Sequence, residues 1–287
     1  LSMPEAVTLA SGVYRVRASV PSRSKATADM VQTDEAFWTI FSFHFLSGEA
    51  FTKADCDAGL TRAVLDATTA RRLFGTTDAV GRTVQLDYVD YTVAGVVADV
   101  SMLATAAYAQ IWVPYTAAGA EAMSWQNDTM GPMHAIILAR SSADFDAIRE
   151  ETELLRKKYN DGLQDVEVFY RGQPDTQLAY LYRRWYAEPD VPGVMLRYAI
   201  VVIILLLVPA VNLSGMTLSR MRRRMAEIGV RKAFGATGGE LMRQVFFENL
   251  VLTLLAGIVG LALSYVATFA LNGFLFSNSM NASLSGE

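Results

Sequence analysis

The chain has 287 residues, a formal net charge of −4 and 52% hydrophobic residues. This composition excludes an intrinsically disordered chain, and the slight acidity argues against nucleic acid as the main partner. The single cysteine, Cys56, excludes an intramolecular disulfide and a cysteine-rich metal site.

Residues 1–193 have the mixed composition of a soluble domain. Alternating apolar and polar residues predict strands at 12–20, 133–139 and 165–170, a hairpin at 84–97 with its turn at 87–90, and a helix at 144–158. The order strand, helix, strand over 133–170 predicts a βαβ unit packed on a sheet. We therefore predict an α+β domain.

Two long apolar segments follow. Residues 198–218 carry no charge, and residues 245–276 carry only Glu248. Because about 20 apolar residues cross a hydrocarbon layer as a helix, we predict transmembrane helices at 195–218 and 244–276. Pro209 is expected to kink the first. Glu248 is either an interfacial residue or a functional group within the membrane.

The segment 219–243 between these helices is strongly basic. Its acidic residues are Glu227 and Glu240. Its basic residues are more numerous, namely Arg220, Arg222, Arg223, Arg224, Arg231, Lys232 and Arg243. Short basic loops stay in the cytoplasm, so residues 1–193 should lie outside it. Residues 277–287 should then begin a second extracytoplasmic segment. Composition alone favours a topology signal that contacts lipid headgroups.

The same segment has readable local structure. Met221, Met225 and Ile228 recur at helical spacing and should share one face of a helix. Glu227 is spaced to pair with Arg223 or Arg231. Gly235 is a plausible helix stop, and the stretch 237–240 (TGGE) has the pattern of a capping box. The segment is predicted to be a helix, a tight turn and the start of another helix.

The stretch 212–260 resembles the signature of the MacB/FtsX family of ABC-transporter permeases. Residues 224–236, RMAEIGVRKAFGA, match the family pattern R-x-x-E-I-G-I-R-K-A-L-G-A with conservative exchanges at Val230 and Phe234. The stretches 41–48, 67–75 and 91–99 resemble the family's periplasmic core domain more weakly. Together these matches cover most of the chain.

The resemblance implies a periplasmic core domain at 1–193 with two lobes, one inserted at about 50–130. It also implies a cytoplasmic coupling helix that contacts an ATP-binding subunit. The positions carried over to that contact are Arg224, Glu227, Ile228, Arg231, Lys232, Gly235 and Ala236. Family members have four spanning helices, so a first helix is expected before Leu1 and a last one after Glu287.

Further partners and a location follow from the same resemblance. We expect a second permease subunit forming a dimer, membrane lipid, and a periplasmic adaptor or cargo, with no nucleic acid. The expected location is the bacterial inner membrane, with residues 1–193 in the periplasm.

The sequence contains no phosphate-binding loop of the G-x-x-x-x-G-K-[ST] type, so ATP should bind to a partner subunit. His44 and His134 have no second ligand at metal spacing, and no serine lies in a G-x-S-x-G elbow. We therefore predict no catalytic, metal or cofactor site. A membrane-anchored periplasmic enzyme would need a polar cluster that the sequence does not offer.

The leading hypothesis is a non-catalytic permease or mechanotransmission subunit. It would couple ATP hydrolysis on a cytoplasmic subunit to movements of a periplasmic domain, for export or extraction of a substrate. The alternative is a two-helix membrane receptor or sensor with an extracytoplasmic ligand-binding domain. A receptor would carry a signalling domain after a spanning helix, whereas this chain returns through the membrane after residues 219–243.

Overall fold

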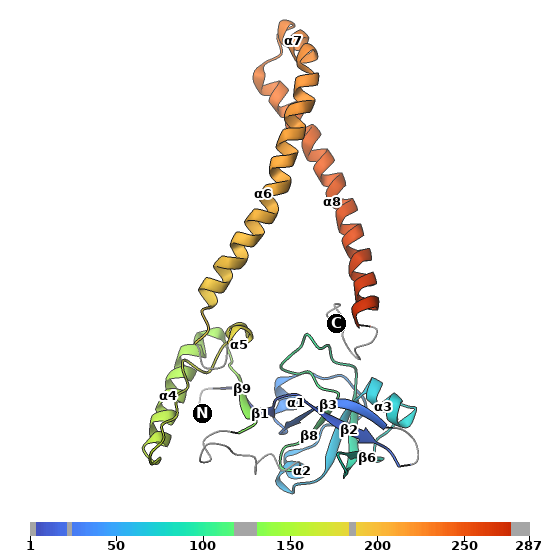
Figure 1. Cartoon of the computed structure of the whole chain (residues 1–287), viewed down its shortest axis with the longest axis vertical. Coiled ribbons are helices and arrows are strands. Elements are labelled where there is room, and N and C mark those ends of the chain that lie inside the picture. Colours follow the sequence, from blue (N-terminus) through green and yellow to red (C-terminus); the bar gives the residue numbers. More distant parts are fainter. Residues whose placement is uncertain (1–3, 22–24, 118–130, 184–187, 277–287) are drawn as a thin grey trace. The chain divides into compact units, whose positions relative to one another are not determined.

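The computed structural model (Figure 1) describes residues 4–21, 25–117, 131–183 and 188–276. It divides into two units, one of residues 1–169 together with 268–287 and the other of residues 170–267, and each is described by itself. The first unit contains the sheet, and the second contains most of the long helical segments.

The first unit alternates strands with short helices. Its strands are β1 (Ala6–Ser11), β2 (Tyr14–Ser19), β3 (Lys25–Thr33), β4 (Phe45–Gly48), β5 (Arg62–Asp66), β6 (Thr83–Leu86), β7 (Val89–Val97), β8 (Ile111–Pro114) and β9 (Met133–Leu138). Its helices are α1 (Phe37–Ile40), α2 (Lys53–Asp57), α3 (Ala67–Phe74) and α4 (Phe145–Asn160), with a 3₁₀ turn at Ser142–Asp144. The predicted α+β domain, with helices and strands mixed along the N-terminal region, is confirmed.

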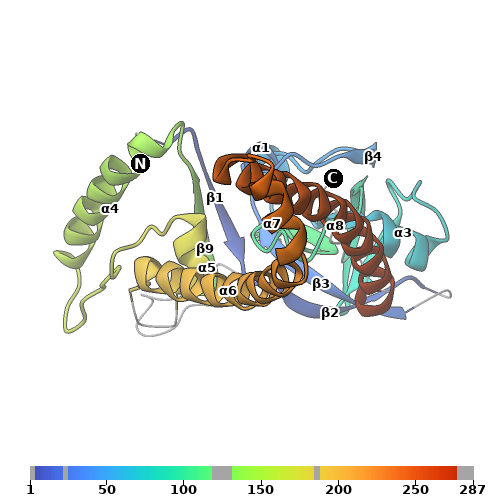
Figure 2. The ribbon, with the colours of Figure 1, turned by 90° about the horizontal axis from the view of Figure 1, so that it is seen from above.

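Six strands close into a ring of pairings in the order β2-β6-β7-β5-β8-β3, because β3 also pairs with β2. The pairs β5–β7 and β3–β8 are parallel, and the other neighbours in the ring are antiparallel. β4 adds to β7 outside this ring. β1 and β9 form an antiparallel two-strand extension from β3 (Figure 2).

The ring closes around apolar side chains. On β2, Val16 and Ala18 are buried while Arg15 and Arg17 are exposed, so one strand face points into the core as the sequence predicted. Ring strands and α3 contribute to one apolar cluster, which includes Leu65, Leu73 and Ile111. A second cluster gathers aromatic side chains around the fully buried Trp112, including Phe37 and Phe43.

The crossing of β4 and β7 requires glycine. Gly48 has φ +67, and a Cβ there would lie 2.2 Å from the carbonyl oxygen of Ala94. A Cβ on Gly95 would lie 2.6 Å from the carbonyl oxygen of Glu49. Both separations are far below van der Waals contact, so this approach of two backbones leaves no room for a side chain.

The predicted hairpin is confirmed, since β6 pairs antiparallel with β7 through the turn at Asp87 and Tyr88. Both turn residues have positive φ, as a type I′ turn requires. The predicted strand at 133–139 and helix at 144–158 correspond to β9 and α4.

The strand predicted at 165–170 is wrong. Asp165 has φ +63, and the backbone that follows is bound by side chains of α4 instead of a neighbouring strand. Asn160 accepts from the amide of Val168 at 3.0 Å and donates to its carbonyl at 3.0 Å, and Arg156 donates to the same carbonyl at 2.9 Å. The parallel strand–helix–strand connection lies elsewhere, from β5 through α3 to β7.

The second unit begins with a short ordered segment before the long helices. Arg183 forms a buried ion pair with Asp175 and donates to the carbonyl of Arg171 at 3.1 Å. Helix α5 (Gln177–Tyr182) contacts α6 (Val191–Arg223), where the rings of Tyr182 and Tyr198 lie 6.3 Å apart. This segment therefore ties the start of α6 to the chain that precedes it.

Helix α6 and helix α8 (Gly238–Phe276) are joined by α7 (Met225–Ala233). Two helices of the described chain, Val191–Arg223 and Gly238–Leu271, are long and apolar enough to cross a membrane, and their most apolar stretches are not buried by protein. Two candidate transmembrane helices linked by a short helix were predicted, and this arrangement is confirmed. Helix α6 runs through Pro209.

Some predicted boundaries stay predictions, including the division at residue 193 and the spans 195–218 and 244–276. The segment 277–287 lies outside the described residues, as does 118–130 of the inserted lobe predicted at about 50–130. The described strands of that range, β5 to β8, belong to the same sheet as β2 and β3.

Candidate functional site

The elbow, residues 219–243, contains the last turn of α6 and then a break between two helices. Helix α6 ends at Arg223, Arg224 has φ −97 and ψ 7, and α7 begins at Met225. The amide of Arg224 bonds to the carbonyl of Met221 at 3.1 Å, a tighter pattern than that of an α-helix. The prediction that Met221, Met225 and Ile228 share one continuous helix is therefore wrong, although Met221 and Ile228 line the same groove.

The end of α7 is closed by a Schellman motif, as the predicted stop at Gly235 requires. The amide of Gly235 bonds to the carbonyl of Lys232 at 3.1 Å, and the amide of Ala236 to that of Arg231 at 3.0 Å. Gly235 has φ +94, which glycine adopts without steric cost. These bonds fix the direction in which the chain leaves α7.

A capping box then starts α8, as predicted. Glu240 accepts from the amide of Thr237 at 2.9 Å, and the amide of Glu240 contacts the Thr237 hydroxyl at 3.4 Å. Both ends of the turn between α7 and α8 are thus specified by local hydrogen bonds.

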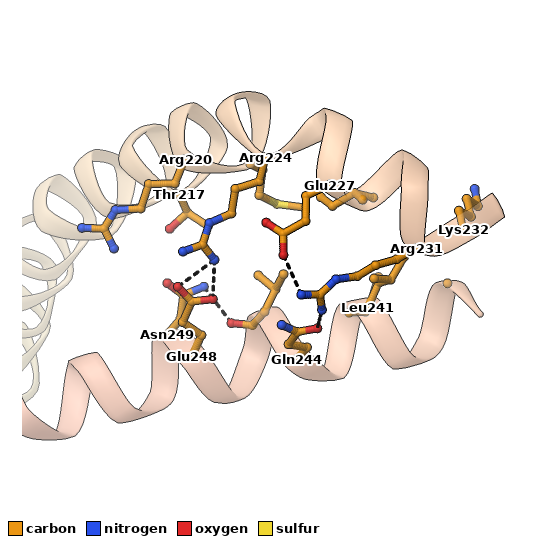
Figure 3. Close-up of a pocket in the computed structure, with 15 residues that line it drawn as sticks. Thr217, Arg220, Arg224, Glu227, Arg231, Lys232, Leu241, Gln244, Glu248 and Asn249 are labelled. Atoms are coloured by element: carbon orange, nitrogen blue, oxygen red, sulfur yellow. Dashed lines mark hydrogen bonds and ion pairs between the residues drawn. The ribbon is translucent and has the colours of Figure 1, made fainter. Parts of the chain in front are cut away.

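Charged side chains bind α7 to the first turns of α8 (Figure 3). The Nη1 atom of Arg224 donates to both carboxylate oxygens of Glu248, at 3.0 and 2.8 Å. Arg231 donates to Gln244 at 2.6 Å and to Glu227 at 2.5 Å. Glu227 therefore pairs with Arg231, one of its two predicted partners. Glu248, for which two roles were open, forms an ion pair across the elbow.

A groove of about 350 Å³ lies between these helices. Its apolar wall includes the half-buried side chains of Ile228, Leu241 and Val245. Arginines and a lysine outnumber the carboxylates in its lining, which consists of Thr217, Arg220, Met221, Arg224, Glu227, Ile228, Arg231, Lys232, Gly238, Leu241, Met242, Gln244, Val245, Glu248 and Asn249.

A second hollow of about 460 Å³ is lined by Val230, Arg231, Phe234, Gly235, Ala236, Glu240, Leu241 and Gln244. The ring of Phe234 is 89% exposed and Val230 is 57% exposed, so α7 presents apolar surface here. Exposed large apolar side chains at one spot are typical of a contact surface.

The seven predicted coupling positions are therefore divided between two surfaces. Five of them line the groove, namely Arg224, Glu227, Ile228, Arg231 and Lys232, whereas Gly235 and Ala236 line the second hollow together with Arg231. The prediction missed Gln244, which binds Arg231, and the exposed Phe234. Phe234 is the one aromatic residue of the basic segment 219–243, and this was the signal for it.

In the first unit, one buried carboxylate stands out. Asp66 is fully buried, caps α3 and accepts from the amide of Thr69 at 2.7 Å. Burial raises the pKa of the Asp66 carboxyl to about 7 in spite of this bond. Within the described residues no three histidine, cysteine or carboxylate side chains are grouped so as to hold a metal ion.

Comparison with known families covers both parts of the chain. Residues 1–155 match the MacB-like periplasmic core domain, and residues 199–286 match the FtsX-like permease C-terminal domain. The chain belongs to the MacB/FtsX family of ABC-transporter permeases. As a member of this family it is a membrane protein with a periplasmic segment.

Two similar proteins place this MacB/FtsX permease among longer relatives. It is 29% identical over 231 residues to the pyoverdine export ATP-binding/permease protein PvdT of Pseudomonas aeruginosa, covering 79% of this chain and 33% of that protein. It is 26% identical over 258 residues to the macrolide export ATP-binding/permease protein MacB of Chromobacterium violaceum, covering 89% of this chain and 38% of that protein. The chain thus spans about a third of the length of these relatives.

Solved structures resemble the permease more distantly. The periplasmic region of MacB from Actinobacillus actinomycetemcomitans aligns at a TM-score of 0.44 and 19% identity, over 55% of this chain and 69% of that one. The extracellular domain of the ABC-type transporter YknZ from Gram-positive bacteria aligns at 0.44 and 18% identity, over 55% of this chain and 78% of that one.

Proposed function

We propose that this chain is the permease or mechanotransmission part of an ABC transporter. It couples ATP hydrolysis on a cytoplasmic ATP-binding subunit or domain to movements of its periplasmic domain. The chemistry of ATP hydrolysis takes place on that partner, and the chain itself is non-catalytic. The work done is export or extraction of a substrate; the names of PvdT and MacB describe export of pyoverdine and of macrolides by those proteins.

The observation that carries this proposal is the way α7 is fixed. It follows α6 directly at Arg224 and is joined to α8 by the Arg224–Glu248 and Arg231–Gln244 contacts. A helix that is bound to both spanning helices passes on a displacement, whereas a flexible loop absorbs it.

The surface of α7 that would receive the partner is the second hollow. Phe234 and Val230 are exposed there, beside Gly235 and Ala236 of the turn. An exposed aromatic ring is a good anchor for a protein contact, because it buries a large apolar area when a partner pocket covers it. The groove adjoins this hollow, since Arg231, Leu241 and Gln244 line both, and its residues Arg224 and Glu227 then support α7.

The proposal includes an orientation and an assembly. The basic elbow lies in the cytoplasm, α6 and α8 cross the bacterial inner membrane, and residues 1–193 lie in the periplasm. Two permease subunits form a dimer, and the periplasmic domain contacts an adaptor or cargo.

The test is a pull-down of the full-length permease with its ATP-binding partner, comparing Phe234→Gln with Met225→Gln. Both side chains lie on or next to α7 and are largely exposed, but only Phe234 lines the second hollow. We expect Phe234→Gln, Gly235→Trp and Glu227→Arg to weaken association and Met225→Gln to leave it unchanged. Equal binding by all variants would refute the elbow as the contact site.

A further inference from the structure

The end of the groove nearest to the apolar segments has positive charge without a protein partner. Within the described residues the side chain of Arg220 forms no ion pair or hydrogen bond, and the side chain of Arg224 uses only Nη1 on Glu248. Arg220 and Arg224 both line the groove, toward the end of it where Glu248 lies (Figure 3). Thr217 lines the groove one turn before Arg220.

All charges that face this groove can be counted from its lining. Arg220, Arg224, Arg231 and Lys232 are the cations, and Glu227 and Glu248 are the anions. Glu248 pairs with Arg224, and Glu227 pairs with Arg231. Arg220 and Lys232 remain at opposite ends of the groove (Figure 3), so the lining has a net positive charge.

The direction of Arg220 determines which ligand can reach it. Side chains in an α-helix lean toward its N-terminus, and the apolar residues 198–218 lie on that side of Arg220 in α6. The guanidinium therefore reaches back toward the membrane surface from the end of the spanning segment. Arginine side chains at helix ends reach the headgroup layer in this manner.

The apolar wall distinguishes a lipid from a soluble anion. Met221 and Val245 line the groove beside these arginines, and Val245 opens the apolar stretch of α8. A phosphate held by Arg220 and Arg224 would have apolar side chains next to its ester groups, which suits an acylated ligand.

We propose that this end of the groove binds the phosphodiester headgroup of an anionic membrane phospholipid. Arg220 is the principal phosphate ligand, the unused donors of Arg224 are the second, and the Thr217 hydroxyl is the third. Guanidinium donors bind phosphate oxygens in pairs, which favours arginine at both positions. The bound lipid completes the polar contacts between α6 and α8 at the membrane surface.

The test measures binding of phosphatidylglycerol to the full-length permease by native mass spectrometry in detergent. Arg220→Gln is compared with Arg222→Gln. The control removes the same charge two residues further along the chain, and the Arg222 side chain does not line the groove. We expect Arg220→Gln to weaken phosphatidylglycerol binding about fivefold relative to Arg222→Gln, because only Arg220→Gln removes charge-assisted hydrogen bonds to the phosphate. Arg220→Lys should weaken phosphatidylglycerol binding less than Arg220→Gln does.

Three outcomes would overturn the proposal. Equal losses in Arg220→Gln and Arg222→Gln would mean a diffuse charge effect, and no loss in either would mean that the groove holds no lipid. Displacement of phosphatidylglycerol by inorganic phosphate would assign the site to a soluble anion. Association with the ATP-binding partner, measured on the same variants, should be unchanged, so this test is separate from that of the proposed function.

Discussion

At the residue scale, the elbow depends on an ion pair between positions far apart in the chain. Arg224 and Glu248 are 55% and 41% exposed, so water screens much of their attraction. Partly exposed pairs contribute about 0.2–1 kcal/mol, and here a single guanidinium nitrogen donates to both carboxylate oxygens. Its main effect is to fix how α7 lies on α8.

Charge reversal tests this pair. Arg224→Glu and Glu248→Arg should each loosen α7, because each places like charges opposite one another. The double variant restores opposite charges and should recover most of the lost protection of the α7 amides. Hydrogen exchange of the α7 amides measures the effect, with an expected coupling of about 0.5–1 kcal/mol. Arg223→Glu is the control, since Arg223 does not line the groove. Two additive single effects would contradict the pairing.

The buried carboxyl of Asp66 should make the stability of the first unit depend on pH. Its pKa is about 7 in the fold against an ordinary 3.8, so the folded state keeps a proton that the unfolded chain releases. This contribution to stability is complete below pH 3.8 and is lost as the pH rises to about 7.

Asp66→Asn removes that titration and keeps a side-chain acceptor for the amide of Thr69. The stability of the variant relative to the wild type should therefore rise between pH 4 and about 7 and then level off. Urea unfolding at several pH values, followed by tryptophan fluorescence, measures it. Asp78→Asn, at an exposed carboxylate of the same unit, is the control. A stability difference between Asp66→Asn and the wild type that does not change with pH would refute the prediction.

At the scale of elements, the turn from α7 to α8 is set by one left-handed residue. Gly235→Ala should destabilise the turn by roughly 1 kcal/mol, because an alanine at positive φ brings its Cβ close to the backbone. Gly238→Ala, where an added Cβ meets nothing within 4 Å and φ is not positive, should be neutral or stabilising. Hydrogen exchange across α7 compares the two variants, and equal effects would contradict the role of Gly235.

The elements of the elbow that could be predicted are those with local signals. Gly235 and the pair Thr237 and Glu240 act over three or four residues, so the sequence alone reveals their bonds. The Arg224–Glu248 contact joins positions 24 residues apart, and no local pattern indicates it. The break at Arg224 was missed for the same reason, since helical spacing continues unbroken across it.

The first unit also combines features that local sequence signals predict with features that depend on distant positions. The hairpin of β6 and β7 follows from alternation and turn residues. The closed ring needs β2 to pair with β6 as well as with its sequence neighbour β3, and the sequence does not specify the distant partner β6. Alternation at 165–170 suggested a strand, but Asn160 and Arg156 supply the hydrogen bonds that a neighbouring strand would have made.

At the scale of the whole molecule, the sheet unit contains its own core. The members of both apolar clusters that are fully buried lie between residues 10 and 113, so no residue of the long helices is needed to complete them. A ring of paired strands also leaves few unpaired edges, which favours an independently stable domain.

We therefore expect the fragment 1–169 to fold without the helices. It should unfold cooperatively in urea, and tryptophan emission should report the transition because the fully buried Trp112 becomes exposed to water. Gly95→Ala should lower the midpoint strongly, since its Cβ would meet the carbonyl of Glu49. Non-cooperative unfolding of the wild-type fragment would show that the domain depends on the rest of the chain.

Pro209 gives α6 a mechanical property of its own. It has no N–H group, so the carbonyl of Leu205 loses its usual helical donor within the apolar segment. Hydrocarbon offers no water to replace that bond. The helix therefore consists of two stiff segments that meet at its least rigid step, below the membrane surface. In the proposed coupling, movement entering at the elbow would bend α6 most easily there, so the two ends of one helix would not need to move by the same distance.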